Sequence, residues 1–186
     1  MAHPFRVRYH AAVSMDGFIA SPDGGVEWLD KLPPATDMEG VFEAFMASLG
    51  GMVVGRTTFE KAMSLGWAFG DLPTVVMTRR PYEGPLPPSV QLVGDDPEEA
   101  LAALARRGIS GDIWLMGGGV LATTFLEKHL LHGVEPAVIP VLVGSGIPFL
   151  KPFTGGVVDL KLTESRAYNN GLVWSKYEVI YPEDIQ

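Results

Sequence analysis

The stretch IWLMGGGVLATTFLE, residues 113–127, places three glycines between an apolar run and a run of helix-forming residues. The apolar run predicts a strand, and Val120, Leu121, Phe125 and Leu126 recur with helical period after the glycines. Glycines at such a turn permit a positive φ and let the backbone approach a ligand, while the free N–H groups of the next helix attract a phosphate. Taken alone, the glycines favour the alternative of a tight turn without a ligand.

The same alternation of strand and helix runs along the chain. Helical periodicity predicts crossover helices through Met38, Val41, Phe42, Phe45 and Leu49, through Ala100, Leu101, Leu104 and Ala105, and after the three glycines. Strands alternating with helices predict an α/β fold, in which helices cover both faces of a mostly parallel sheet. The predicted strands are apolar stretches rich in β-branched residues at 5–13, 52–55, 74–78, 90–93, 112–116 and 133–143.

The C-terminal part of the sequence departs from this alternation. Residues 158–168 and 171–181 each alternate polar with apolar side chains, and Asn169, Asn170 and Gly171 form a turn signal between the two runs. We therefore expect an antiparallel C-terminal hairpin at the edge of the sheet. No stretch has the composition of an interdomain linker, so we expect residues 1–186 to form a single domain.

Composition excludes several classes of protein. The 186 residues carry a net charge of -8, which argues against broad binding to a nucleic-acid backbone. The chain has no cysteine, so it has no disulfide, cysteine nucleophile or thiolate metal site, and its four histidines show no metal-ligand spacing. The sequence also lacks a signal-peptide pattern and an apolar run of the roughly 20 residues that a bilayer span needs. We expect a cytoplasmic protein that binds neither metal, membrane nor nucleic acid.

A second turn from strand to helix lies in MVVGRTTFEKA, residues 52–62. Gly55 ends the predicted strand, and one interpretation is an ordinary capping box in which Thr57 or Thr58 caps the helix, with Glu60 close behind. That interpretation leaves Arg56 unexplained, because the helix dipole disfavours a cation at this end unless an anion also binds there. Arg56 therefore favours a phosphate site.

A third strand end, VVMTRRP, places Thr78, Arg79 and Arg80 directly after an apolar run. Ligands of open α/β sheets gather at the carboxyl ends of strands. The three strand ends together offer backbone amides for a diphosphate and guanidinium groups for an additional phosphate. We therefore expect NADP rather than NAD, although the spacing of the glycines differs from the G-x-G-x-x-G fingerprint of a Rossmann fold.

Five blocks, in order, give the sequence a resemblance to the dihydrofolate reductase-like superfamily. The branch that it resembles most is the reductase of riboflavin biosynthesis, the C-terminal domain of a bifunctional deaminase-reductase. The resemblance implies a three-layer αβα fold with a mostly parallel central sheet and NADPH across the strand ends. The blocks are SMDGFIA (14–20), MVVGRTTFE (52–60), VMTRR (76–80), IWLMGGG (113–119) and AVIPVLVGSGIPFL (137–150).

The resemblance also implies a set of cofactor-binding residues. Ala12 and Ile19 would lie beside the nicotinamide, and the other residues would surround the phosphates. The adenosine phosphates would lie near Gly55, Arg56, Thr57, Thr58, Thr78, Arg79 and Arg80, and the diphosphate near Gly117, Gly118, Gly119, Val120 and Leu121. Relatives of this type are often homodimers, and the apolar segment 135–149 is the expected interface.

The expected reaction is hydride transfer from NADPH to a small heteroaromatic or ribosylamino-pyrimidine-like substrate. Asp37 and Glu39 are the candidate proton donors; helical periodicity places them on opposite borders of one apolar stripe and does not choose between them. The Asp-Asp-Pro that follows the Gly-Thr block in riboflavin reductases is absent here. Two alternatives therefore stay open: reduction of a pterin, as in dihydrofolate reductases, and NADP(H) binding without turnover.

Overall fold

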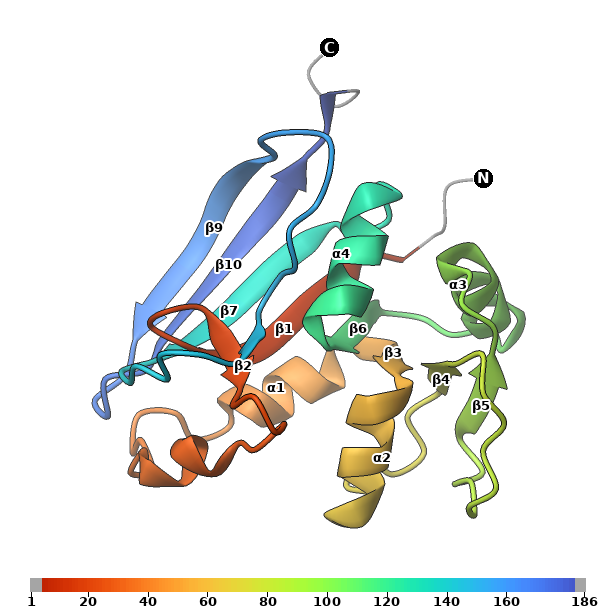
Figure 1. The fold of residues 1–186 in the computed structure, drawn as a ribbon, viewed down its shortest axis with the longest axis horizontal. Helices are drawn as coiled ribbons and strands as arrows, with labels where there is room; N and C mark the ends of the chain where they lie inside the picture. The colour runs from red at the N-terminus through yellow and green to blue at the C-terminus, as the bar shows by residue number, and fades with distance from the viewer. Residues whose placement is uncertain (1–4, 183–186) are drawn as a thin grey trace.

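The computed structural model describes residues 5–182. Eight strands form one sheet in the order β5-β4-β3-β6-β1-β7-β10-β9, in which all neighbours from β5 to β7 are parallel and β10 is antiparallel to both β7 and β9 (Figure 1). Two short strands, β2 and β8, pair separately. The elements are β1 Val7–Ser14, β2 Phe18–Ala20, the 3-10 helix η1 Glu27–Lys31, α1 Val41–Ala47, β3 Leu49–Gly55, α2 Arg56–Ser64, β4 Thr74–Met77, β5 Val90–Val93, α3 Pro97–Arg106, β6 Asp112–Gly117, α4 Gly119–Glu127, β7 Gly133–Ile139, β8 Ile147–Pro148, β9 Asp159–Ala167 and β10 Val173–Ile180.

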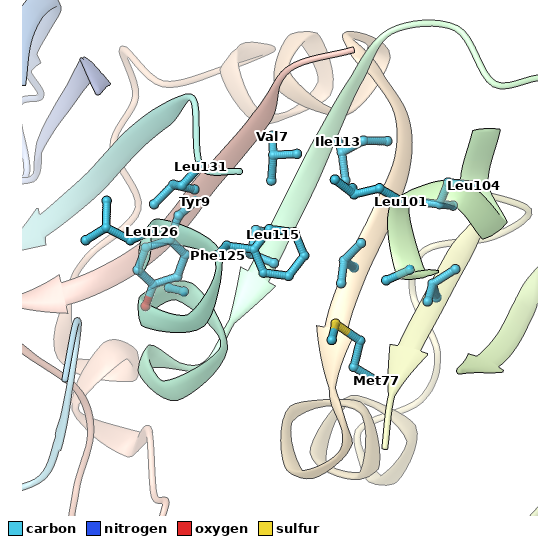
Figure 2. Close-up of a cluster of buried hydrophobic side chains, with 14 of the residues drawn as sticks. Val7, Tyr9, Met77, Leu101, Leu104, Ile113, Leu115, Phe125, Leu126 and Leu131 are labelled. Atoms are coloured by element: carbon cyan, nitrogen blue, oxygen red, sulfur yellow. The ribbon is translucent and has the colours of Figure 1, made fainter. Parts of the chain in front are cut away.

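Helices cover both faces of the sheet, because side chains of each strand alternate between two cores. On one face, α3 packs against β4 and α4 against β6, and Figure 2 shows Phe125 of α4 beside Tyr9 and Leu115. On the other face, Phe45 of α1 packs with Trp114 and Trp174, and Phe59 of α2 lies over Val54 and Val76. The expected three-layer αβα fold, with its parallel sheet and C-terminal hairpin, is confirmed.

The structure corrects the predicted first helix. Helix α1 begins at Val41, with Gly40 as N-cap at a φ of 74°, so Met38 lies in the preceding turn and Leu49 already belongs to β3. Asp37 and Glu39 therefore precede the helix and do not border its apolar stripe. Strand β3 begins three residues before the predicted start, because its glycines permit a close approach of backbone. A side chain at Gly50 would collide with the carbonyl of Ser110.

Two further predictions about local structure are wrong. Neither Thr57 nor Thr58 caps α2, because the helix already begins at Arg56 and its N-cap, Gly55, offers no side chain. The predicted strand 133–143 ends at Ile139, since Pro140 has no N–H for a ladder and Val141 N–H donates to Ile139 O over 2.8 Å.

The segment 135–149 is bound to neighbouring strands and loops of the same subunit, but it is partly exposed, with Leu142 at 76%. Its first part belongs to β7, which pairs with β1 on one side and β10 on the other. Its second part binds the loop after β1, where Val141 O accepts from Met15 N–H and Phe149 N–H donates to Gly17 O. These contacts do not test the expectation that the segment forms a dimer interface, which stays a prediction.

Charged side chains of alternating sign cross five neighbouring strands on the α1 face. Arg8 of β1 lies 3.0 Å from Asp112 of β6 and 3.2 Å from Glu135 of β7. Lys176 of β10 lies 2.7 Å from Glu164 of β9. Burial raises the pKa of Glu135 above its usual range, while Arg8 and Lys176 act in the opposite direction. The buried half of this row depends on pairing, because an isolated charge there is costly.

His10 lies among aromatic rings next to this row. Its ring stacks on Trp174 with centroids 4.5 Å apart, and Nδ1 donates to the carbonyl oxygen of Glu135 over 2.9 Å. Burial lowers the pKa of His10 from 6.5 to about 4. Because the folded-state pKa is depressed, the neutral ring contributes stability above pH 6.5, and that stability is lost as the pH falls toward 4.

Replacement of His10 tests this linkage. We expect the unfolding free energy of the wild type to fall by about 2 kcal/mol more between pH 7 and pH 5 than that of His10→Gln. Only in the wild type does unfolding expose a neutral histidine ring that then takes up a proton at pH 5. Urea denaturation at both pH values measures the difference. Parallel pH profiles for the two proteins would contradict the assignment.

Candidate cofactor site

Three strand ends meet at one edge of the sheet. Strand β3 lies between β4 and β6, and all three are parallel. In the register, Gly55 pairs with Met77 of β4, and Val54 pairs with Gly117 of β6. The sequences after these strands, which begin with Arg56, Thr78 and Gly118, therefore emerge side by side. The predicted convergence of the three motifs is what the topology shows.

The glycines at this edge allow backbones to approach one another. Gly117 has a φ of 106°, a left-handed value that side chains rarely adopt, and its peptide bond to Gly118 is cis. A Cβ on Gly55 would lie 3.4 Å from the carbonyl oxygen of Gly117, and a Cβ on Gly118 would lie 3.3 Å from Cδ1 of Ile19. The turn and Ile19, a predicted nicotinamide neighbour, thus lie in contact.

Gly119, the third glycine of the turn, leaves room for another part of the chain. A side chain there would collide with the carbonyl oxygens of Pro148 and Phe149, so the chain itself occupies this space. Helix α4 begins at this residue, and its N-cap, Gly118, makes no side-chain cap. The first N–H groups of a helix have no partner within the helix, so the start of α4 offers donors to an anion. Val120, in this first turn, is 57% exposed.

Arg56 already has partners within the protein. Its Nε donates to Glu60 over 2.7 Å, and Nη1 donates to the carbonyl oxygens of Arg80 and Pro81 over 3.1 and 2.9 Å. Its guanidinium also lies 4.8 Å from the centre of the Tyr82 ring. The anion that accompanies Arg56 at the helix start is therefore Glu60, and Arg56 fastens the loop after β4 to α2.

The other two arginines lie at the surface of the same loop. Arg79 forms an ion pair with Asp95 over 3.3 Å, and both side chains are exposed. Arg80 is exposed, and no ion pair involves its side chain within residues 5–182. The hydroxyl of Thr78 accepts from the backbone N–H of Arg80 over 3.1 Å, which holds this turn. Of the predicted guanidinium groups, that of Arg80 is the one with no competing carboxylate.

A carboxylate that the sequence argument missed holds the loop after β1. Asp16 accepts from the backbone N–H groups of Val143 and Gly144, at 3.0 and 2.7 Å, and from the hydroxyl of Ser14 at 2.6 Å. These hydrogen bonds lower the pKa of Asp16 to about 2. The loop leads from β1, which carries Ala12, to β2, which carries Ile19. In the sequence, the only signal for the role of Asp16 was its place in the block SMDGFIA, residues 14–20.

The two candidate proton donors lie apart from these residues. The carboxylate of Asp37 accepts from the backbone N–H of Asn169 over 3.1 Å, and its carbonyl oxygen accepts from Arg166 over 2.8 Å. Glu39 borders a cavity of about 450 Å³ between α1 and the β9–β10 hairpin, which none of the predicted cofactor residues lines. Within the described chain, no hydrogen bond or ion pair joins either carboxyl group to the cofactor residues.

Residues 5–182 contain neither a membrane-spanning helix nor a cluster of side chains that could hold a metal ion. The helices in this range are all too short or too polar to span a membrane. Likewise, no group of three or more His, Asp or Glu side chains in this range is placed to hold a metal ion.

Comparison with known proteins gives consistent matches. The model of the RibD C-terminal domain family matches residues 6–174. The uncharacterized protein YwjB of Bacillus subtilis is 29% identical over 149 residues, which are 78% of this chain and 82% of that protein. A solved structure from Shewanella sp. PV-4, described as a candidate riboflavin biosynthesis protein, has a TM-score of 0.83 at 24% identity and covers 95% of this chain and 100% of that one.

A dihydrofolate reductase has the same fold. The structure of the Enterococcus faecalis enzyme complexed with NADP(H) has a TM-score of 0.64 at 17% identity, and the match covers 95% of this chain and 97% of the enzyme. At such identities the likeness shows the fold alone. The expected dihydrofolate reductase-like architecture, in the form found in riboflavin-pathway reductases, is therefore confirmed.

Replacement of Asp16 tests whether its hydrogen bonds hold the loop after β1. We expect Asp16→Ala to speed amide hydrogen exchange at Val143 and Gly144 and across 14–20, because three hydrogen bonds are lost while the sheet stays intact. Exchange measured by mass spectrometry reports this directly. Asp23→Ala is the matched control, since Asp23 accepts only from Gly25 within its own turn and its loss leaves Val143 and Gly144 protected.

Proposed function

The chain belongs to the RibD C-terminal domain family, and on that premise we propose that it is an NADPH-dependent oxidoreductase. Its substrate is a small heteroaromatic or ribosylamino-pyrimidine-like molecule, similar to 5-amino-6-(5-phosphoribosylamino)uracil. We further propose that the working unit is a homodimer. Family membership supports the reductase class, and the geometry of the strand ends supports the cofactor.

The observation that carries the proposal is the convergence of β4, β3 and β6 on a turn without side chains. Gly117 and Gly118 bring the backbone against the Tyr9 ring and Ile19, and α4 begins there without a side-chain cap. A diphosphate fits such a site, because it needs close backbone approach and N–H donors at a helix start. A tight turn without a ligand would not require the ends of β3, β4 and β6 to meet at one place.

The proposed roles follow the position of each residue. Gly117 to Leu121 would bind the diphosphate, and Ala12 and Ile19 would lie beside the nicotinamide. The adenosine end would lie at Gly55, Thr57, Thr58, Thr78, Arg79 and Arg80. Within this set we assign the additional phosphate to Arg80, with Arg79 as a second ligand after release from Asp95. Arg56 acts by holding the carbonyl groups of Arg80 and Pro81 in place.

The bound cofactor supplies the hydride, and the chain supplies orientation and exclusion of water. Asp16 keeps the loop between Ala12 and Ile19 fixed to Val143 and Gly144, so the nicotinamide end of the site has a rigid wall. Asp37 is bonded to the β9–β10 turn and Glu39 borders another cavity. We therefore propose water as the proton donor, in preference to either carboxyl group.

NADP(H) binding without turnover is a second candidate function, and the same observation about Asp37 and Glu39 favours it. Two measurements separate turnover from binding alone. Titration calorimetry measures NADPH binding, and the absorbance of NADPH then reports its oxidation in the presence of 5-amino-6-(5-phosphoribosylamino)uracil. We expect heat of binding and then oxidation of NADPH with this substrate, and no oxidation with dihydrofolate. NADPH binding without oxidation of NADPH by either compound would support the second candidate, and no binding would refute both.

Arginine substitutions test the phosphate assignment. We expect Arg80→Ala to weaken NADPH binding about tenfold and to leave NADH binding unchanged, because only NADPH carries the additional phosphate. Arg79→Ala should have a smaller effect, since Asp95 already competes for that side chain. Arg106→Ala, at the end of α3, is the control. Equal losses for both cofactors in Arg80→Ala would overturn the assignment.

A further inference from the structure

Strand β9 forms one edge of the sheet (Figure 1). Every one of its nine residues is exposed, including Leu160 and Leu162 at 46% and 53%. The opposite edge strand, β5, has only four residues and follows the Pro-rich segment 81–88. Proteins usually protect an edge strand by shortening it or with proline, charges or a bulge. Strand β9 is long and free of proline, and its charges alternate in sign, so a second strand can offset them instead of being repelled. In contrast to β5, β9 thus has the length and the free edge that pairing with another strand requires.

A β-bulge divides β9 into two halves. Lys176 of β10 pairs with Glu164 and the next residue, Tyr177, pairs with Leu162, so Thr163 is the extra residue. A bulge shifts the alternation of side chains by one position. The register therefore places the four charged residues of β9 on the face of Lys176, and the leucines and small residues on the face of Tyr177. The charged set is Asp159, Lys161, Glu164 and Arg166, and the other set is Leu160, Leu162, Ser165 and Ala167.

The same register decides which backbone groups are free. At the hairpin turn, Tyr168 N–H donates to Leu172 O over 2.8 Å. Hydrogen-bonded and non-hydrogen-bonded pairs alternate along an antiparallel ladder. Ser165 therefore directs its backbone N–H and C=O away from β10, and beyond the bulge Leu162 and Leu160 do the same. These are the groups that a further strand would bind.

We propose that β9 pairs antiparallel with β9 of a second copy, about a two-fold axis at Leu162. Leu162 then faces Leu162 of the second copy, and Leu160 faces Ser165. On the charged face, Lys161 meets Glu164 and Asp159 meets Arg166. The axis repeats each of these ion pairs, so four pairs of opposite charge flank one apolar contact.

The bulge is what makes this edge complementary to itself. In a regular strand with the same axis, Lys161 would face Thr163 and Asp159 would face Ser165. The extra residue moves Glu164 and Arg166 into register with the opposite charges. Because the match depends on the two-fold relation, a second copy fits this edge better than an unrelated strand. The eight-stranded sheets of the two copies would then join into one continuous sheet. This surface is that of the homodimer proposed above, and it does not depend on cofactor binding.

Cysteine cross-linking tests the register, because the natural chain has no cysteine. Leu162→Cys places two thiols opposite each other at the axis, within the Cα separation of about 5.5 Å that a disulfide accepts. We expect mild oxidation to yield a covalent dimer. Val157→Cys is the control: this residue is 93% exposed but lies five positions from the axis, so it should not cross-link.

Sedimentation velocity completes the test. We expect the wild type to sediment as a dimer, and Leu162→Lys, which sets two ammonium groups against each other at the axis, to raise the dimer dissociation constant at least about tenfold. Circular dichroism and NADPH titration on the same variant show whether fold and cofactor binding persist. A monomeric wild type, a dimer insensitive to Leu162→Lys, or equal cross-linking at positions 157 and 162 would each overturn the proposal while leaving the proposed cofactor site untouched.

Discussion

Parallel pairing of β3 with β4 and β6 is the constraint on which the candidate site depends. Parallel strands end at one edge of a sheet, so three motifs separated by up to about sixty residues emerge together. The pairing is close because Gly55 and Gly117 carry no side chains at the point where the strands end. A side chain at Gly117 would meet the Tyr9 ring at 3.2 Å and would require a φ of 106°, which side chains rarely adopt.

A second constraint fixes the other side of the same site. The segment between β7 and β8 accepts Met15 N–H at Val141, donates to Asp16 from Val143 and Gly144, and continues into the β2–β8 pair. Further along, Phe149 O accepts from the hydroxyl of Tyr9, whose ring stacks on Phe149. The loop after β1 is thus bound along its length, which suits a wall that positions a flat ring and excludes water.

The charged side chains show how one sequence pattern can serve two purposes. Arg56 lies at a helix start, as it would in a phosphate site, yet Glu60 and two carbonyl groups already satisfy it. Arg80 has no ion pair in the described chain, so its guanidinium N–H groups are available to a phosphate. On the other side of the molecule, the row of charges from Asp112 to Glu164 ends at the exposed strand β9, where the bulge sets the charge pattern.

By itself, the sequence determined the order of strands and helices, the antiparallel hairpin and the three glycine- or arginine-rich strand ends, because periodicity and turn signals are local properties of the chain. The family resemblance extended this to the full architecture. Only the tertiary structure decided which partner each polar side chain has: Asp16 binds Gly144, Asp37 binds Asn169 and Arg56 binds Pro81. It also decided that α1 begins after Glu39 and that β7 ends at Ile139. These outcomes depend on contacts between segments far apart in the chain, which no local pattern records.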